Sequence, residues 1–263
     1  MTRTGWQNFH QRWSRLKPPQ RPHPQTVVTF SHALKGKCDH ALLLGVTPEL
    51  TDLATELTAL DGSENMIAHI WPGDTQTRRA VLGNWLAMPF NGPRFSAVLG
   101  DGSLNTLAYS DYPALFAQLR AVLLPGARLA LRIFITPDAC ESLKRLRDQT
   151  FSGAVESFHG FKWRLANSLV TRNGNPNLAV MQLHAVFERE FPDRAALAQA
   201  TGWPKEDIDG IDAYAHNDSV YSFPTAREIM AAIPQDFSNA RLISSGNYEL
   251  AERCPILVAD FGS

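Results

Sequence analysis

The chain has 263 residues, 44% of them hydrophobic, which is enough to bury the core of one α/β domain with a helical insertion. Its 25 basic and 26 acidic residues give a formal net charge of -1, so no global field recruits nucleic acid or an anionic membrane surface. The widely separated Cys38, Cys140 and Cys254 argue against a disulfide scaffold and a zinc knuckle, and a reducing cytoplasm is the simplest setting. No apolar stretch approaches the ~20 residues that cross a bilayer, and no secretory signal opens the chain.

The first 35 residues predict an N-terminal helical cap. Residues 6 to 16 carry large apolar side chains at helical spacing, which predicts a short amphipathic helix. The proline-rich stretch PPQRPHP (residues 18–24) bars a helix because proline lacks a backbone N–H. A second helix is expected at roughly residues 24 to 35.

Residues 36–137 alternate between apolar strands and helices. Strands are expected at residues 40–45, 56–60, 79–83, 95–100 and 128–135, and helices at residues 48–54, 66–70 and 111–123. Such alternation implies right-handed crossovers and a mostly parallel sheet that is covered on both faces.

The alternation stops after Pro137. Residues 138–235 are mostly helical in pattern and predict a helical insertion that covers the substrate. Within residues 236–263, strands are expected at residues 240–244 and 255–261. Such a hairpin completes the sheet and puts an antiparallel strand at its edge.

The first strand and its loop, ALLLGVTPEL (residues 41–50), are the default ligand site, because open α/β sheets bind ligands at the carboxyl ends of their strands. Gly45 is not followed by the further glycines that let a backbone approach a pyrophosphate. Thr47 suits a helix N-cap, Pro48 the first helical position and Glu49 the first turn. The Glu49 carboxylate repels a pyrophosphate but tolerates a phosphate-free ligand with some positive charge. A well-capped helix without any ligand is the alternative interpretation.

The second strand ends at Asp61. A carboxylate at that position accepts hydrogen bonds from both hydroxyls of a ribose. An Asp-Gly pair is also common in plain turns, so a purely structural role is the alternative.

Five segments resemble, in this order, the successive motifs of the class I S-adenosylmethionine-dependent methyltransferases: LLLGVTPEL, ALDGSENMI, GNWLAMPF, FSAVLGDGSLN and LLPGARLALRIF. The resemblance covers about residues 18 to 137. It implies a Rossmann-like, seven-stranded, mostly parallel sheet with an antiparallel last strand, and S-adenosyl-L-methionine as the cofactor. The family's first motif usually carries two or three glycines, whereas this chain has Gly45 alone.

The resemblance also implies a role for each matching residue. Next to the methionine portion it places Gly45, Thr47 and Pro48. Asp61 would hold the ribose diol, with Gly62, Ser63 and Met66 close to the adenosine, and Asn84 and Trp85 would line the adenine. The methionine end and the methyl group would face Gly100, Asp101 and Gly102.

Other residues have open interpretations. Arg21 is expected to reach the cofactor carboxylate, with a plain solvated arginine as the alternative. Arg132 either faces the pocket or pairs with an acid. Asp101 and Asn105 form an incomplete shell for a hard cation, so no metal is predicted. The helical segment holds His159, His184 and His216, of which one could be a general base, although a surface or core role suits each of them.

These observations favour a methyltransferase (EC 2.1.1) that moves a methyl group to a nitrogen or oxygen of a small molecule. Positioning supplies much of the rate in such transfers, so no strong catalytic pair is required and none is assigned. The balanced charge disfavours nucleic acid as acceptor. The alternatives are an S-adenosylmethionine enzyme with non-methylating chemistry, and a non-catalytic binding or partner protein. An NAD-dependent oxidoreductase comes last, because the glycines that cradle a phosphate are missing.

Overall fold

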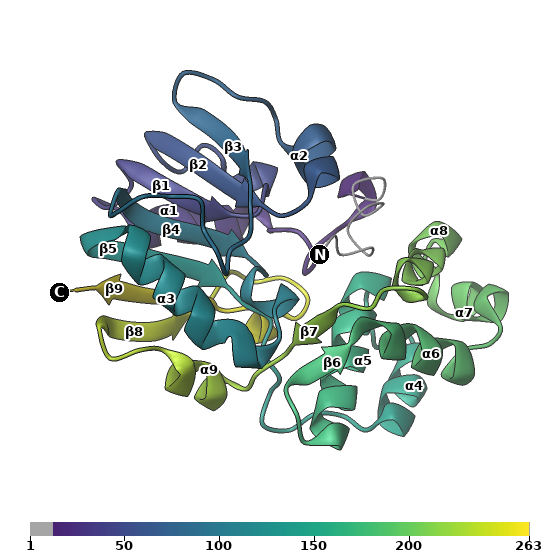
Figure 1. Cartoon of the computed structure of the whole chain (residues 1–263). Helices are drawn as coiled ribbons and strands as arrows, with labels where there is room; N and C mark the ends of the chain where they lie inside the picture. The colour runs from purple at the N-terminus through teal and green to yellow at the C-terminus, as the bar shows by residue number, and fades with distance from the viewer. Residues whose placement is uncertain (1–12, 263) are drawn as a thin grey trace.

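The computed structural model describes residues 13–262, and a seven-stranded sheet in the order β3-β2-β1-β4-β5-β9-β8 forms its centre (Figure 1). The strands are β1 (His40–Leu44), β2 (Glu56–Asp61), β3 (Arg78–Leu82), β4 (Phe95–Asp101), β5 (Leu123–Arg132), β8 (Phe237–Ile243) and β9 (Ile256–Phe261). The helix expected over residues 6–16 lies outside the described residues except at its end, where Trp13–Arg15 form a helical turn.

The middle of the sheet consists of strands whose side chains are apolar on both faces. In β1, Ala41 to Leu44 are buried, and β1 pairs in parallel with β2 on one side and with β4 on the other. Strand order therefore reverses between β1 and β4, and their carboxyl ends form the point where ligands bind in such sheets. β5 starts at Leu123, earlier than expected, because a register shift against β4 accommodates the Pro125-Gly126 pair.

The predicted antiparallel strand exists, but its expected position at the sheet edge is wrong. β9 pairs antiparallel with β5 on one side and with β8 on the other, so β8 forms the edge. The chain reaches the edge first as β8 and then folds back into the gap beside β5. That gap suits β9 because its residues Ile256 to Ala259 are buried on both faces.

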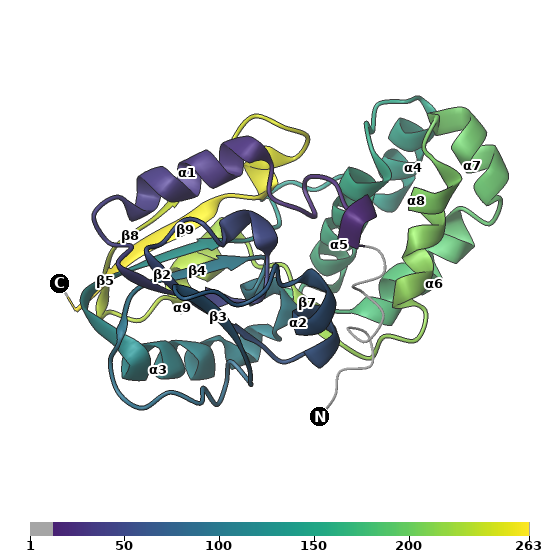
Figure 2. The same ribbon diagram turned by 90° about the horizontal axis from the view of Figure 1, so that it is seen from above.

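Two layers of helices cover the sheet, and Figure 2 shows α1 (Pro24–Leu34) and α3 (Tyr112–Val122) on opposite faces. On the α1 face, Phe30 and Leu34 share a core with residues of β1 and with α2 (Glu64–Ile70). On the α3 face, Leu115 shares a core with Ile229 of α9 (Ala226–Ala232). α1 and α9 thus pack on the sheet, although the sequence grouped them with the cap and the insertion.

A helical lobe lies beside the sheet (Figure 1). It contains α4 (Leu143–Phe151), α5 (Phe158–Asn173), α6 (Val180–Glu190), α7 (Arg194–Thr201), α8 (Lys205–Asp209) and the short helical turn η6 (Gly210–Tyr214). Its core is aromatic, with Phe161 in ring contact with Phe158, Phe187 and Trp203. A short antiparallel pair, β6 (Asn177–Ala179) with β7 (Val220–Ser222), was not predicted, because three-residue strands show no readable alternation. None of the described helices is long and apolar enough to cross a membrane.

Asn105 joins the lobe to the sheet. Its amide donates to the carbonyls of Phe134 (2.8 Å) and Ser222 (2.7 Å), and its oxygen accepts from the Phe134 N–H (2.8 Å). Asn105 is buried, so these bonds replace water for backbone groups at the end of β5 and on β7. This network accounts for Asn105 without a metal.

Replacing Asn105 with alanine should therefore lower the free energy of unfolding by about 2 to 4 kcal/mol, because it leaves buried backbone groups without partners. Chemical denaturation followed by circular dichroism measures this. Asn91→Ala, in an exposed loop, is the matched control and should change the stability by no more than about 0.5 kcal/mol. Equal effects of the two substitutions would contradict this role of Asn105.

Candidate active site

The carboxyl ends of β1, β2 and β3 bring together three of the residues expected at the site. Gly45 adopts φ +105°, which a side chain would strain, and a Cβ there would lie 3.9 Å from Asp61 Oδ2 and 4.0 Å from Trp85 Cζ2. The Leu60 carbonyl fixes the arrangement, since it accepts hydrogen bonds from the Gly45 N–H (2.9 Å) and from Trp85 Nε1 (2.6 Å). The Gly45 N–H is thereby occupied within the protein.

Asp61 ends β2 as a largely buried carboxylate. Its Oδ1 accepts from the Ser63 N–H (2.8 Å), and Ser63 in turn caps α2 through the Met66 N–H. Within residues 13–262 no basic side chain forms an ion pair with Asp61. Burial raises the pKa of Asp61 to about 6, partly opposed by the Ser63 N–H. A carboxylate held in this state gains free energy from any ligand that donates hydrogen bonds to it.

Glu49 provides a second acceptor, because one of its two carboxylate oxygens has no hydrogen-bond partner. The loop after β1 contains only the short helical turn Pro48–Leu50 instead of the helix expected over residues 48–54. Thr47 occupies the N-cap position, but its hydroxyl makes no capping hydrogen bond. Glu49 Oε1 accepts from Arg21 Nε (2.7 Å), whereas the buried Oε2 has no hydrogen-bond partner. Arg21 thus contacts the turn after β1, with its guanidinium paired to Glu49 and lying over the Trp13 ring.

Asp101, at the end of β4, is already compensated. Its carboxylate pairs with Arg132 of β5, which also donates to the Tyr248 hydroxyl (3.0 Å) and the Pro19 carbonyl (2.8 Å). Burial acts to lower the pKa of Arg132, but the Asp101 carboxylate more than offsets it, so the pKa is raised and the guanidinium stays charged. Of the two interpretations of Arg132, pairing with an acid is the correct one.

The glycines at the end of β4, Gly100 and Gly102, are required by close packing. A Cβ on Gly100 would lie 2.6 Å from Ser103 Oγ, and one on Gly102, where φ is +65°, would lie 2.7 Å from a ring carbon of Phe134. The Ser103 hydroxyl donates to the Leu44 carbonyl (2.7 Å) and ties this loop to the end of β1. These glycines let the loop fold closely against β1 and β5.

The remaining expected residues surround the Asp61 end of the site. A Cβ on Gly62 would lie 3.5 Å from the Gly83 carbonyl, so the loops after β2 and β3 are in contact. Asn84 is exposed, and its Oδ1 accepts from the Leu86 N–H (2.9 Å) within its own turn. Met66 is buried in the core beneath α2.

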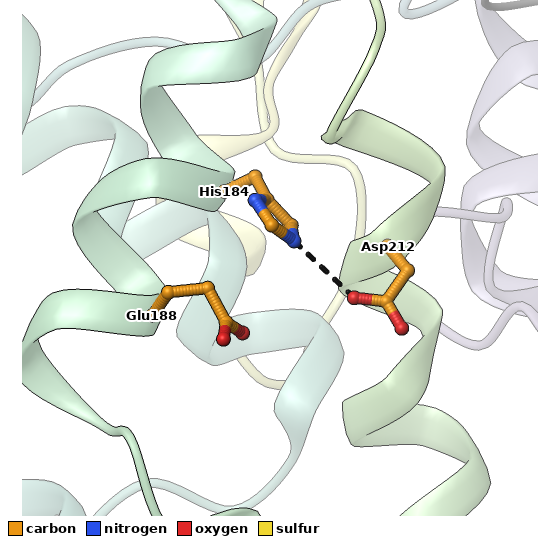
Figure 3. A group of neighbouring side chains, drawn as sticks. All are labelled: His184, Glu188 and Asp212. Atoms are coloured by element: carbon orange, nitrogen blue, oxygen red, sulfur yellow. Dashed lines mark hydrogen bonds and ion pairs between the residues drawn. The ribbon is translucent and has the colours of Figure 1, made fainter.

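One group of side chains in the lobe has the composition of a metal site. His184, Glu188 and Asp212 gather on α6 and η6, and His184 Nε2 lies 3.2 Å from Asp212 Oδ1 (Figure 3). Arg194, however, donates to Glu188 Oε1 (2.6 Å) and to Asp212 Oδ2 (3.0 Å). The Arg194 guanidinium thus forms ion pairs with both carboxylates, and the group is best described as an ion-pair network.

A cavity of about 190 Å³ lies between the N-terminal segment and the lobe. It is lined by Arg15, Leu16, Gln20, His159, Lys162, Glu206, Asp207, Asp209, Gly210, Ala213 and Tyr214. Sequence reasoning singled out His159 but missed Gln20, Lys162 and Asp207, because nothing in their spacing indicates that they meet.

Asp61→Asn should stabilise the ligand-free protein at pH 8 and much less at pH 4.5. The pKa of Asp61 in the folded state is raised above the ordinary 3.8. The ionised carboxylate therefore lowers the free energy of unfolding by its full amount above about pH 6, and this destabilisation disappears as the pH falls towards 4. The predicted gain at pH 8 is up to about 3 kcal/mol. Urea denaturation at both pH values measures it, with the exposed Asp52→Asn as control. A gain that is the same at both pH values would contradict the raised pKa.

No family model and no curated protein sequence matches the chain. Solved structures do match it over nearly its whole length. A protein from Rhodobacter sphaeroides, described as a zinc-dependent alcohol dehydrogenase, is 10% identical with a TM-score of 0.60, covering 98% of this chain and 97% of its own. A methyltransferase from Methanosarcina mazei, described as S-adenosylmethionine-dependent, is 12% identical with a TM-score of 0.51, covering 92% and 98%. The N-methyltransferase NodS from Bradyrhizobium japonicum, solved with S-adenosylhomocysteine, is 9% identical with a TM-score of 0.52, covering 98% of each chain.

At these identities the comparisons concern the fold alone. The strand order distinguishes this sheet from the classic dinucleotide-binding sheet. That sheet is mostly parallel with the order 3-2-1-4-5-6, whereas here an antiparallel strand is inserted between the fifth strand and the edge. The chain therefore has the fold of the class I S-adenosylmethionine-dependent methyltransferases.

Proposed function

We propose that the chain binds S-adenosyl-L-methionine at the carboxyl ends of β1 to β4 and transfers its methyl group to a nitrogen or oxygen of a small molecule. The observation that carries the proposal is Asp61, a largely buried carboxylate without a basic partner among the described residues, beside Gly45 and the Trp85 ring. Two ribose hydroxyls supply the hydrogen bonds that Asp61 lacks, and an aromatic ring suits a purine. The proposed cofactor residues are Arg21, Gly45, Thr47, Pro48, Asp61, Gly62, Met66, Asn84, Trp85, Gly100, Asp101 and Gly102.

The Arg21–Glu49 pair suits the amino-acid end of such a ligand. A methionine group carries a carboxylate and an ammonium, which are the complements of a guanidinium and a carboxylate. Glu49 Oε2 is buried without a hydrogen-bond partner, and the ammonium can donate to it. Because the Gly45 N–H is occupied by the Leu60 carbonyl, Arg21 is the better candidate for the carboxylate.

The chemistry that the cofactor supplies is a methyl group on a sulfonium, whose C–S bond electrons return to sulfur as the acceptor lone pair forms the new bond. The protein binds and aligns the two reactants and excludes water, which can supply about 7 to 11 kcal/mol of the barrier. The helical lobe, with its aromatic core, is the proposed cover over the acceptor.

A dinucleotide is less well suited to this site. A pyrophosphate needs backbone N–H groups and a helix N-terminus, but here the first turn after β1 carries the Glu49 carboxylate and the Gly45 N–H is occupied. For these reasons the dehydrogenase description of one structural neighbour is not carried over.

Calorimetric titration with S-adenosylhomocysteine and with 5′-methylthioadenosine, which lacks the amino-acid group, tests the assignment. Asp61→Asn should weaken both ligands by about tenfold or more, because both contain the ribose. Arg21→Ala and Glu49→Gln should weaken S-adenosylhomocysteine by a similar factor and leave methylthioadenosine within about twofold.

The exposed Asp52→Asn serves as control and should bind both ligands like the unchanged protein. If the unchanged protein binds neither ligand, the cofactor assignment is wrong and the non-catalytic alternative gains support. Mass spectrometry of products then tests the chemistry. Conversion of S-adenosylmethionine to S-adenosylhomocysteine supports methyl transfer, whereas its consumption without that product supports a non-methylating reaction.

A further inference from the structure

The cavity of about 190 Å³ has a polar wall that Gln20 organises. Gln20 Oε1 accepts from Lys162 Nζ (2.6 Å) and lies 2.7 Å from His159 Nδ1, while Gln20 Nε2 donates to the Tyr214 hydroxyl (3.2 Å). An ammonium group only donates hydrogen bonds, so the Gln20 atom at Lys162 must be the oxygen. The same oxygen faces His159 Nδ1, and Nδ1 must therefore carry the proton.

This assignment makes His159 Nε2 a bare acceptor. Burial, together with the charges of Lys162 and Lys17, lowers the pKa of His159 to about 3. A hydrogen bond with the Arg15 backbone opposes this lowering to a smaller extent. The imidazole is therefore neutral near pH 7. His159 is only 3% exposed, and Nε2 has no hydrogen-bond partner. A neutral imidazole with Nδ1 protonated can only accept at Nε2.

A second acceptor faces the first. Asp207 Oδ2 lies 3.9 Å from His159 Nε2, too far for a hydrogen bond, and the Asp207 side chain is 13% exposed. Among residues 13–262 no lysine or arginine forms an ion pair with Asp207. Two mostly buried acceptors that face each other without a donor leave a hydrogen-bonding deficit at the cavity wall.

The other charged side chains around the cavity do not form an ion pair with the Asp207 carboxylate. Lys162 is bound to Gln20 and lies over the Phe158 and Tyr214 rings. Asp209 is paired with Arg194 and Lys205. Of the other charged side chains that line the cavity, Arg15 and Glu206 are exposed. Among residues 13–262, Asp207 is therefore a half-buried carboxylate without a lysine or arginine partner.

We propose that this cavity binds a small amine, whose N–H groups donate to His159 Nε2 and to the Asp207 carboxylate. An alcohol has a single O–H and can satisfy only one of the two acceptors, whereas an amine or ammonium satisfies both. Leu16, Ala213 and the Tyr214 ring provide apolar wall for the rest of the ligand. His159 orients the amine and takes no proton.

This inference goes beyond the proposed function, and the segment Pro19-Gln20-Arg21 connects the cavity to the proposed cofactor site. The Pro19 carbonyl accepts from Arg132 and the Arg21 guanidinium pairs with Glu49, both at the strand ends, whereas the Gln20 side chain lines the cavity. Figure 2 shows the chain running from α1 past the sheet towards α5 and α8. Only this short segment therefore separates an amine in the cavity from the proposed cofactor site.

Benzylamine and benzyl alcohol are matched probes, because they differ only in the group that donates hydrogen bonds. In calorimetric titrations of the unchanged protein, benzylamine should bind about tenfold more tightly than benzyl alcohol. Asp207→Asn should remove most of this preference. Glu206→Gln, the exposed neighbour on α8, should retain it within about twofold. The absence of benzylamine binding at millimolar concentrations, equal binding of the two probes, or an equal loss in both variants would overturn the proposal.

A parallel titration with S-adenosylhomocysteine separates this proposal from the proposed cofactor assignment. Asp207→Asn should bind S-adenosylhomocysteine like the unchanged protein, which also shows that the variant is folded. If the unchanged protein binds S-adenosylhomocysteine but not benzylamine, the amine site alone is wrong. If it binds benzylamine but not S-adenosylhomocysteine, the cofactor assignment is wrong and the ligand class of the cavity stands.

Discussion

The buried ion pair between Arg132 and Asp101 is the interaction on which the arrangement of both sites depends. The two side chains are 0% and 4% exposed, and removing one partner of such a pair leaves an uncompensated charge that costs about 3 to 5 kcal/mol. The Arg132 guanidinium also holds the Pro19 carbonyl and the Tyr248 hydroxyl, so β4, β5, the loop before β9 and the N-terminal connector meet at one cation. Fixing Pro19 in turn places Gln20 at the cavity and Arg21 above the turn after β1.

The carboxylates at the strand ends differ in how far the protein compensates them. Asp101 has a buried cation, whereas Asp61 has one backbone N–H. Glu49 pairs with Arg21 through Oε1, but its buried Oε2 has no hydrogen-bond partner. Buried polar atoms are nearly always satisfied in folded proteins, and the exceptions concentrate where function requires them. The unpartnered oxygen of Glu49 and the raised pKa of Asp61 therefore support the proposed cofactor site, and the ion pair of Asp101 with Arg132 gives Asp101 a structural role as well.

The sequence was sufficient for the features that depend on local pattern. The core strands could be predicted because their side chains are buried on both faces, and Asp61 because a carboxylate ends such a strand. It was insufficient where residues far apart in the chain meet. The acid that Arg132 pairs with, the partner of Arg21 and the insertion of β9 beside β5 all depend on tertiary packing. Gln20 and His159 lie 139 positions apart, so no spacing rule could bring them together.

The titration of the Asp61 carboxyl group, followed by ¹³C NMR with and without S-adenosylhomocysteine, tests the central claim most directly. In the free protein its pKa should be about 6, because the carboxylate is buried with a single hydrogen bond. Hydroxyl donors from a bound ribose stabilise the ionised form, so the ligand should lower the pKa by about one unit or more. An Asp61 pKa that is the same with saturating ligand as without it would contradict the account.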